Sequence, residues 1–187
     1  GRIDEAERDC SDGIKLARSI DDRLEEGALL RVLAEVCYSK GDNTAAEVLV
    51  NRAEDMLRRA GESFELAKIA MADAIGLRDS AAVGAAVPLD RIEARFSAAE
   101  SAFARIGLPH WVALCELERG KALHQAGQPD RARPWLERAR LKFEQAHDAQ
   151  SVAQVDAVLR GLDAELADAA VAKHTRYDLI AGRYRVL

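Results

Sequence analysis

The segment ELERGKALHQAGQPDRARPWLERA, residues 116–139, carries the pattern that decides the fold. Its small and apolar residues recur every three or four positions on both sides of the break at Gly127-Gln128-Pro129-Asp130. That spacing is the period of an α-helix, and glycine followed by proline and aspartate is typical of a turn between two helices. The segment therefore predicts two helices joined by a short turn.

The pattern of the second helix recurs along the chain. Runs of small and apolar residues at the same spacing start at positions 6, 46, 92 and 132, so 40, 46 and 40 residues separate them. The pattern of the first helix starts at positions 30, 70 and 116, with the same offsets of 40 and 46. The six additional residues fall in the apolar loop Ser80–Pro88, which we expect either to pack against the helices or to contact a partner. Two patterns with the same offsets indicate an internal repeat of helical hairpins.

Eight helices are predicted, at about 2–18, 23–40, 43–60, 63–79, 89–106, 109–126, 129–146 and 149–172. One hairpin alone cannot bury its apolar face, so neighbouring hairpins should stack and share a core. The last helix has a stripe of apolar residues from Val152 to Ala169, for which two interpretations stand: a cap over the final hairpin, or a seam that forms a homodimer. Residues 1–172 are then one helical domain, and residues 173–187 are a tail or linker towards a following domain.

Composition and charge disfavour several function classes. The 187 residues carry 27 basic and 32 acidic side chains, a net charge of −5, with the two signs interspersed. A nucleic-acid-binding protein usually shows a basic surplus or stripe, so direct contact with nucleic acid is not expected. No apolar stretch is long enough for a membrane span. Three separate cysteines in helical patterns are expected to be apolar side chains of a reduced, cytoplasmic protein.

The spacing of small residues resembles the tetratricopeptide repeat. Gly120, Leu123, Gly127, Ala132, Leu136 and Ala139 carry the resemblance best, followed by Ala34, Cys37, Gly41, Ala46, Val50 and Ala53. The 40-residue spacing is similar to the long-helix variety found in bacterial signalling proteins and transcription regulators. The resemblance covers about residues 2–147 and implies an all-α, right-handed superhelix of helical hairpins. The family's usual aromatic residues are missing.

Asp73 and Arg119 stand where the tetratricopeptide family prefers leucine, at equivalent places in adjacent repeats. One hypothesis is an ion pair between the two, facing inward. The alternative is that a small rotation of each helix turns both side chains to solvent, where such a pair contributes less than about 1 kcal/mol.

Motifs of catalysis and metal binding are missing from the sequence. The four histidines are scattered, the cysteines are unpaired, and Gly84 lies in an alanine-valine loop that has no lysine. Zinc sites and phosphate-binding loops need closer and more specific spacings. We therefore predict no catalytic residue, no metal and no cofactor.

The resemblance implies that the first helix of each hairpin lines a concave groove, where a partner would bind. The side chains expected there combine an apolar centre with charged and aromatic ends; they are Arg31, Glu35, Tyr38, Lys68, Met71, Ile75, Arg78, Leu114, Leu117, Lys121 and His124. Such a strip suits an extended peptide or an amphipathic helix. The leucines could equally belong to the core. Trp111 is expected to pack on the preceding helix.

These patterns predict a protein-interaction module, a regulatory or sensory segment of a larger bacterial cytoplasmic protein. Its partner would be a protein or peptide, in trans or from another domain of the same chain. The alternative is a domain of a transcription regulator that senses a small-molecule effector. A cavity closed by the loop Ser80–Pro88 would favour the small molecule, and an open groove would favour the peptide.

Overall fold

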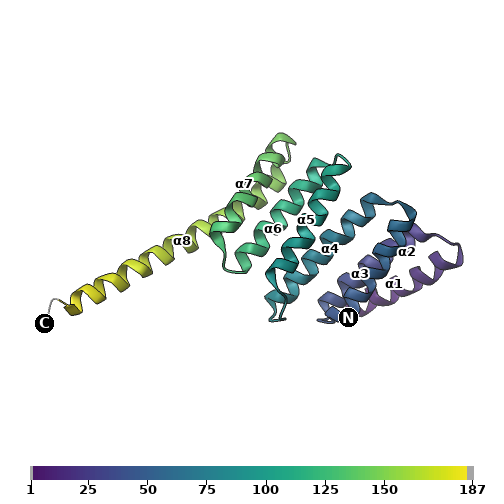
Figure 1. Cartoon of the computed structure of the whole chain (residues 1–187), viewed down its shortest axis with the longest axis horizontal. Helices are drawn as coiled ribbons and strands as arrows, with labels where there is room; N and C mark the ends of the chain where they lie inside the picture. The colour runs from purple at the N-terminus through teal and green to yellow at the C-terminus, as the bar shows by residue number, and fades with distance from the viewer. Residues whose placement is uncertain (1, 185–187) are drawn as a thin grey trace.

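The computed structural model describes the backbone of residues 2–184 and the side chains of residues 2–168. This part of the chain consists of eight α-helices and contains no strand. The helices are α1 (Arg2–Ser19), α2 (Arg23–Ser39), α3 (Asn43–Ala60), α4 (Ser63–Ala82), α5 (Leu89–Arg105), α6 (Pro109–Gln125), α7 (Pro129–Gln145) and α8 (Ala149–Tyr184). The all-α fold expected from the sequence is confirmed (Figure 1).

Two helices are longer than the sequence pattern predicts. Helix α4 runs to Ala82 rather than to residue 79, because the alanines after Ser80 are strong helix formers and the first break is Gly84, with φ of 98°. Helix α8 runs to Tyr184, so the predicted end of this helix at about residue 172 is wrong. No proline interrupts residues 173–184 in the sequence, and Gly182 is the one glycine there. Residues 185–187 lie outside the described residues.

The helices stack as antiparallel pairs in two layers (Figure 1). Helices α2 and α3, α4 and α5, and α6 and α7 form the three pairs, while α1 packs on α2 and α8 packs on α7. On the inner side α2 contacts α4, α4 contacts α6, and α6 contacts α8. Helices α1, α3, α5 and α7 form the outer layer. Because the inner helices contact each other, their side chains define the concave surface.

Tight turns between the helices follow the sequence signals. Gly61 directly follows α3 and Gly127 follows α6 after one further residue; their φ values of 77° and 69° are ones in which glycine ends a helix without strain. Asp42 caps α3 by accepting a hydrogen bond from the backbone N–H of Ala45 at 2.9 Å. In α7, Gln128 precedes the first helical residue, which places Pro134 in the second turn.

Small residues let the two helices of a pair approach closely. A Cβ atom added to Gly120 in α6 would lie 2.6 Å from Leu136 Cδ2 in α7, so a larger residue would push the helices apart. The alanines of the repeat pattern, such as Ala46 and Ala139, are fully buried. The first half of α8 completes this core, because Val155 and Leu162 are fully buried in the cluster formed with α6 and α7. These side chains are therefore not free to form a seam with a second chain. Ala169 lies outside the described side chains.

No described helix has an apolar stretch of the length and hydropathy that a membrane crossing requires.

Candidate functional site

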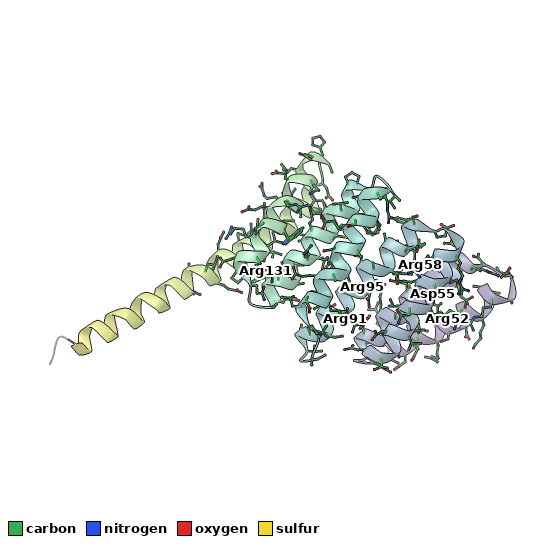
Figure 2. All side chains as sticks on the ribbon, in the orientation of Figure 1. Arg52, Asp55, Arg58, Arg91, Arg95 and Arg131 are labelled. Atoms are coloured by element: carbon green, nitrogen blue, oxygen red, sulfur yellow. The ribbon has the colours of Figure 1, made fainter. Side chains whose placement is uncertain are left out.

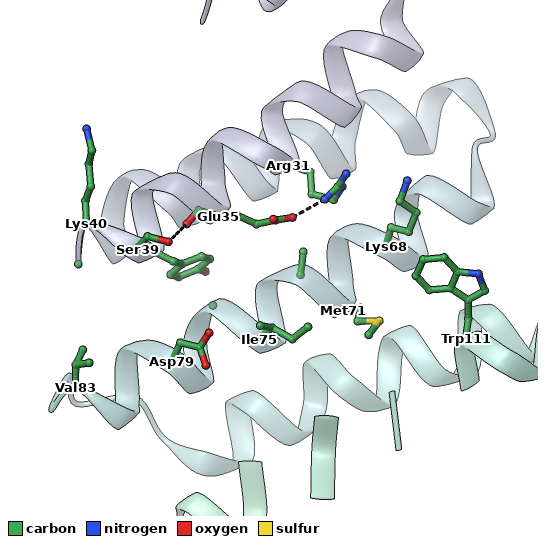
Figure 3. A pocket seen from close by; sticks show the side chains of 14 residues that line it. Arg31, Glu35, Ser39, Lys40, Lys68, Met71, Ile75, Asp79, Val83 and Trp111 are labelled. Carbon is green, nitrogen blue, oxygen red and sulfur yellow. Dashed lines mark hydrogen bonds and ion pairs between the residues drawn. The ribbon is translucent and has the colours of Figure 1, made fainter. Parts of the chain in front are cut away.

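A cavity of about 640 Å³ lies between α2 and α4 and reaches the first turn of α6 (Figure 3). Its lining comes from three inner helices and from the turns that follow α2 and α4; the residues are Arg31, Glu35, Tyr38, Ser39, Lys40, Gly41, Lys68, Met71, Ala72, Ile75, Gly76, Asp79, Val83 and Trp111. The volume is within the range of about 300–1,000 Å³ that is typical of ligand sites. This cavity is the main candidate for a binding site.

The cavity brings together side chains that the sequence places in the concave groove. Six of the eleven predicted residues line it, namely Arg31, Glu35, Tyr38, Lys68, Met71 and Ile75. Residues four positions apart on α2 and on α4 point to the same side of their helices, and the two helices lie next to each other. The first two repeats thus build the site by the geometry that the repeat pattern predicts.

Apolar side chains form the floor and one end of the cavity. Met71 and Ile75 point into it from α4, and Trp111 lies at the end next to Met71 (Figure 3). The Trp111 ring stacks on Phe103 of α5, with centroids 5.1 Å apart, and meets the edge of Phe64 of α4 at 5.4 Å. Trp111 therefore packs on the preceding helix, as expected, and also forms a wall of the cavity, which the sequence did not indicate.

Charged side chains surround this apolar floor. Arg31 pairs with Glu35 one turn later on α2, and Lys68 pairs with Glu65 at 2.9 Å on α4. At the other end, Lys40 Nζ lies 3.1 Å from Asp4 of α1. The Nε atom of Arg31 is buried without a hydrogen-bond partner among the described side chains. A ligand in the cavity would therefore meet an apolar surface with polar groups at both ends.

A chain of polar contacts fixes the wall that Tyr38 forms. Its hydroxyl donates a hydrogen bond to the buried carboxylate of Asp73, whose other oxygen lies 2.6 Å from Nε of Arg95 on α5. Arg95 also donates to Glu54 on α3. Burial and the bond to Asp73 both raise the pKa of Tyr38 above its ordinary value, so the hydroxyl stays protonated. These contacts join four helices and hold the Tyr38 ring against Gly76 of α4.

Both hypotheses for Asp73 and Arg119 are wrong. Asp73 is 5% exposed and binds Tyr38 and Arg95, as described above. Arg119 lies 3.1 Å from Glu93 of α5, with its guanidinium 3.9 Å from the ring centre of Trp135. The two residues are equivalent within their repeats, but Asp73 pairs with α5 of its own hairpin, whereas Arg119 pairs with α5 of the preceding hairpin and stacks on Trp135 in α7 of its own. They therefore neither pair with each other nor point to solvent.

The other five predicted groove residues do not reach the cavity. Leu117 is 1% exposed and belongs to the core formed with α7 and α8, so its assignment to an open groove is wrong. Leu114 is half-buried against the same core. Arg78 and Lys121 both bind Glu118 of α6. His124 lies 2.9 Å from Glu165 of α8. Because α8 packs beside α6, the third repeat buries or pairs the groups that were expected to face a partner.

The segment predicted as a loop, Ser80–Pro88, begins inside α4, packs in part and leaves the cavity uncovered. Ser80 donates a hydrogen bond to Asn43 Oδ1 at 2.8 Å, and Val87 packs against the core. Val83 lines the edge of the cavity but is 84% exposed, so the loop does not form a roof (Figure 3). The sequence could not place Val83 or Lys40 at the site, because turn residues carry no periodic signal. Asp79 lies on α4 one turn after Ile75, so the helical period could have indicated it.

Residues of the metal-binding kind do not converge in this part of the molecule. Among residues 2–168, no group of three or more histidine, cysteine, aspartate or glutamate side chains is arranged to hold a metal ion. The three cysteines are unpaired and buried, and burial raises the pKa of the Cys115 thiol to about 12. The geometry at the cavity supports binding through apolar contacts and hydrogen bonds.

A similar fold occurs in a solved structure. The crystal structure of BtubC (BKLC) from P. vanneervenii matches with a TM-score of 0.68 over 87% of this chain, at 22% sequence identity. The chain spans 66% of the length of that protein. At this identity the likeness concerns the fold alone. No protein-family model and no curated protein sequence matches the chain.

Proposed function

We propose that this chain is a non-catalytic protein-interaction module of the tetratricopeptide kind. It holds a segment of a partner polypeptide in the cavity between α2 and α4. The partner is a separate protein or another part of the same chain, and the module serves as a regulatory or sensory segment of a cytoplasmic bacterial protein.

The observation that carries the proposal is the composition and shape of the cavity. Met71, Ile75 and Trp111 offer an apolar surface on the concave side of two neighbouring helices, and paired charges lie at both ends. A peptide that places one or two apolar side chains on this floor would bury them, while its backbone and polar groups reach the ends. The side of the cavity next to Val83 is open, so a chain could enter and leave there.

A small-molecule effector is the second candidate, and the cavity volume of about 640 Å³ favours it. An effector site usually encloses most of the ligand surface. Val83 lies at the edge of the cavity and is exposed, so the loop after α4 does not cover the cavity, and this open geometry suits a peptide better.

Selection from a displayed library of random peptides, with the whole chain as target, tests the proposal. Trp111 and Trp135 are the two tryptophans. A Trp135→Phe variant therefore reports on Trp111 alone, and a peptide in the cavity should change its fluorescence. Met71→Asp places a charge on the apolar floor and should weaken binding of the selected peptides at least about tenfold.

Val48→Asp is the matched control, because Val48 is an exposed apolar residue on α3 outside the cavity. It should leave peptide binding unchanged. Peptides that bind both variants as tightly as the parent would place the interaction elsewhere, and a selection without any enriched sequence would argue against peptide binding. Saturable binding of a small metabolite with the same dependence on Met71 would favour the effector.

A further inference from the structure

Complementary charges join the outer helices across two of the grooves between them. On α5, Arg91 pairs with Glu47 of α3 at 3.1 Å, and Arg95 pairs with Glu54 of α3. On α7, Arg131 pairs with Glu93 of α5 at 2.7 Å, and Arg138 pairs with Glu100 of α5 at 3.2 Å. Figure 2 shows Arg91, Arg95 and Arg131 on this face. In both grooves, carboxylates of one helix meet arginines of the next.

The groove between α1 and α3 breaks this rule. Arg18 of α1 faces Arg52 and Arg59 of α3 across a hollow of about 540 Å³, and Arg23 of α2 lines the same hollow. Arg52 is visible on this part of α3 in Figure 2. Like charges repel across a groove, and the hollow separates them where the other two grooves are filled by ion pairs.

The carboxylates at the hollow do not balance its arginines. Glu26 lies buried at the floor, and its Oε1 atom alone accepts from both Arg18, at 2.6 Å, and Arg52, at 2.9 Å. Arg23 has a partner in Asp21, at 3.3 Å, whose side chain is 83% exposed. The remaining lining carboxylate, Asp55, pairs with Arg58 outside the hollow at 2.9 Å.

Arg59 has no carboxylate within ion-pair distance in the described part of the chain. Four arginines therefore face two carboxylates that are not engaged elsewhere, an excess of two positive charges, in a protein whose net charge is −5. Each guanidinium carries five N–H donors, and the hydrogen bonds of Arg18 and Arg52 to Glu26 use one donor each.

We infer that this hollow binds a phosphate-bearing anion. Guanidinium groups donate paired hydrogen bonds to phosphate oxygens, and a doubly charged phosphate matches the excess of positive charge. The anion fills the place that glutamates of the preceding helix fill in the other two grooves, and it bridges α1 and α3. This site lies on the outer layer, away from the concave cavity, so it is independent of the proposed peptide site.

Calorimetric titration of the whole chain at constant ionic strength tests the inference. Constant ionic strength separates specific binding from the general screening of charges. Inorganic pyrophosphate is the probe for a free phosphate ligand, and a short phosphoserine peptide, compared with its unphosphorylated form, is the probe for a modified protein. Saturable binding of either probe supports the site, and the tighter of the two identifies the source of the phosphate.

Arg59→Gln is the informative variant, because it removes donors of the hollow without exposing the buried charge of Glu26. It should weaken pyrophosphate or phosphopeptide binding about tenfold. Arg105→Gln, a change at another exposed arginine near a helix end, is the control and should bind as the parent does. Glu26→Gln removes the internal anion that competes for Arg18 and Arg52, and it should tighten binding.

The inference is overturned if neither probe binds saturably to the parent chain. Equal losses in Arg59→Gln and Arg105→Gln would also overturn it, because they would show a response to overall charge. Weaker binding by a folded Glu26→Gln variant would mean that the anion and Glu26 do not compete, which contradicts the proposed geometry. Circular dichroism checks that each variant is folded.

Discussion

Replacement of Gly76 by alanine tests the packing that shapes the cavity. An added Cβ at Gly76 would lie 2.1 Å from Cδ2 of Tyr38 and 2.5 Å from its Cγ, far inside normal contact. The Tyr38 ring cannot move aside freely, because it is buried and its hydroxyl is bound to Asp73. Either α2 and α4 separate, or Tyr38 leaves its place.

The expected magnitude combines two opposing effects. Alanine is favoured over glycine inside a helix by about 1 kcal/mol. Overpacking costs about 1–3 kcal/mol, and loss of the hydrogen bond to the Asp73 carboxylate would cost about 1.5–3 kcal/mol more. The net expectation for Gly76→Ala is therefore a decrease in the free energy of unfolding of about 1.5–5 kcal/mol if the hydrogen bond to Asp73 is lost, and of no more than about 2 kcal/mol if it is kept. In a chain of this length that corresponds to a decrease in Tm of about 2–4 °C per kcal/mol.

Urea unfolding followed by circular dichroism measures the change, and Gly161→Ala is the matched control. The Cβ added at Gly161 in α8 would meet its nearest neighbour, Cε1 of His124, at 4.0 Å, which is ordinary contact. This control should gain up to about 1 kcal/mol from helix propensity. In a Tyr38→Ala background, Gly76→Ala should no longer destabilise the chain, because the clashing ring is gone. Equal gains in Gly76→Ala and Gly161→Ala would refute the described packing of Tyr38 on α4.

Three further predictions follow from burial and hydrogen bonding. Leu117→Asp should strongly lower the urea midpoint because it buries a charge in the core, whereas Leu141→Asp, at a side chain that is 55% exposed, should change the free energy of unfolding by no more than about 0.5 kcal/mol. Cys115, whose pKa is raised to about 12 by burial, should react with iodoacetamide at neutral pH only when the chain unfolds, as mass spectrometry with and without urea can show. The hydrogen bond from Ser151 lowers the pKa of the Asp148 carboxyl. The ionised carboxylate therefore stabilises the fold above its pKa in the unfolded chain, about 3.9, and this stabilisation is lost as the pH falls through the lowered pKa. The Tm difference between the parent and Asp148→Ala should shrink over that acidic range.

The repeat pattern was sufficient to place most helices and the first half of the site. Six of the eight helices begin and end within one residue of their predicted bounds, in the outer and inner layers alike. Helices α4 and α8 run past their predicted ends because the sequence patterns contain no stop signal there. Tyr38, Met71 and Ile75 line the same cavity, and the sequence could bring them together because the inner side of α2 and α4 follows directly from the hairpin geometry.

The third repeat could not be read in the same way. Helix α6 contacts α4, α5, α7 and α8, so apolar residues occur around most of its circumference. A helix that is buried on several sides gives no single apolar stripe, and periodicity then cannot separate a core leucine such as Leu117 from one that faces a groove. The two hypotheses for Asp73 and Arg119 were wrong for a different reason. The partner of a polar residue at a core position can be identified only when the positions of the neighbouring helices are known.

The charges on the outer helices also restrict how the array could be lengthened. In the outer layer, α5 carries arginines that face α3 and glutamates that face α7. A tandem copy of the α4–α5 pair would therefore match both neighbours. A copy of the α6–α7 pair would instead set Arg133 and Arg140, which bind Asp163 and Asp156 of α8, against arginines of the duplicate. Growth by duplication is thus electrostatically permitted in the middle of this chain and opposed next to α8.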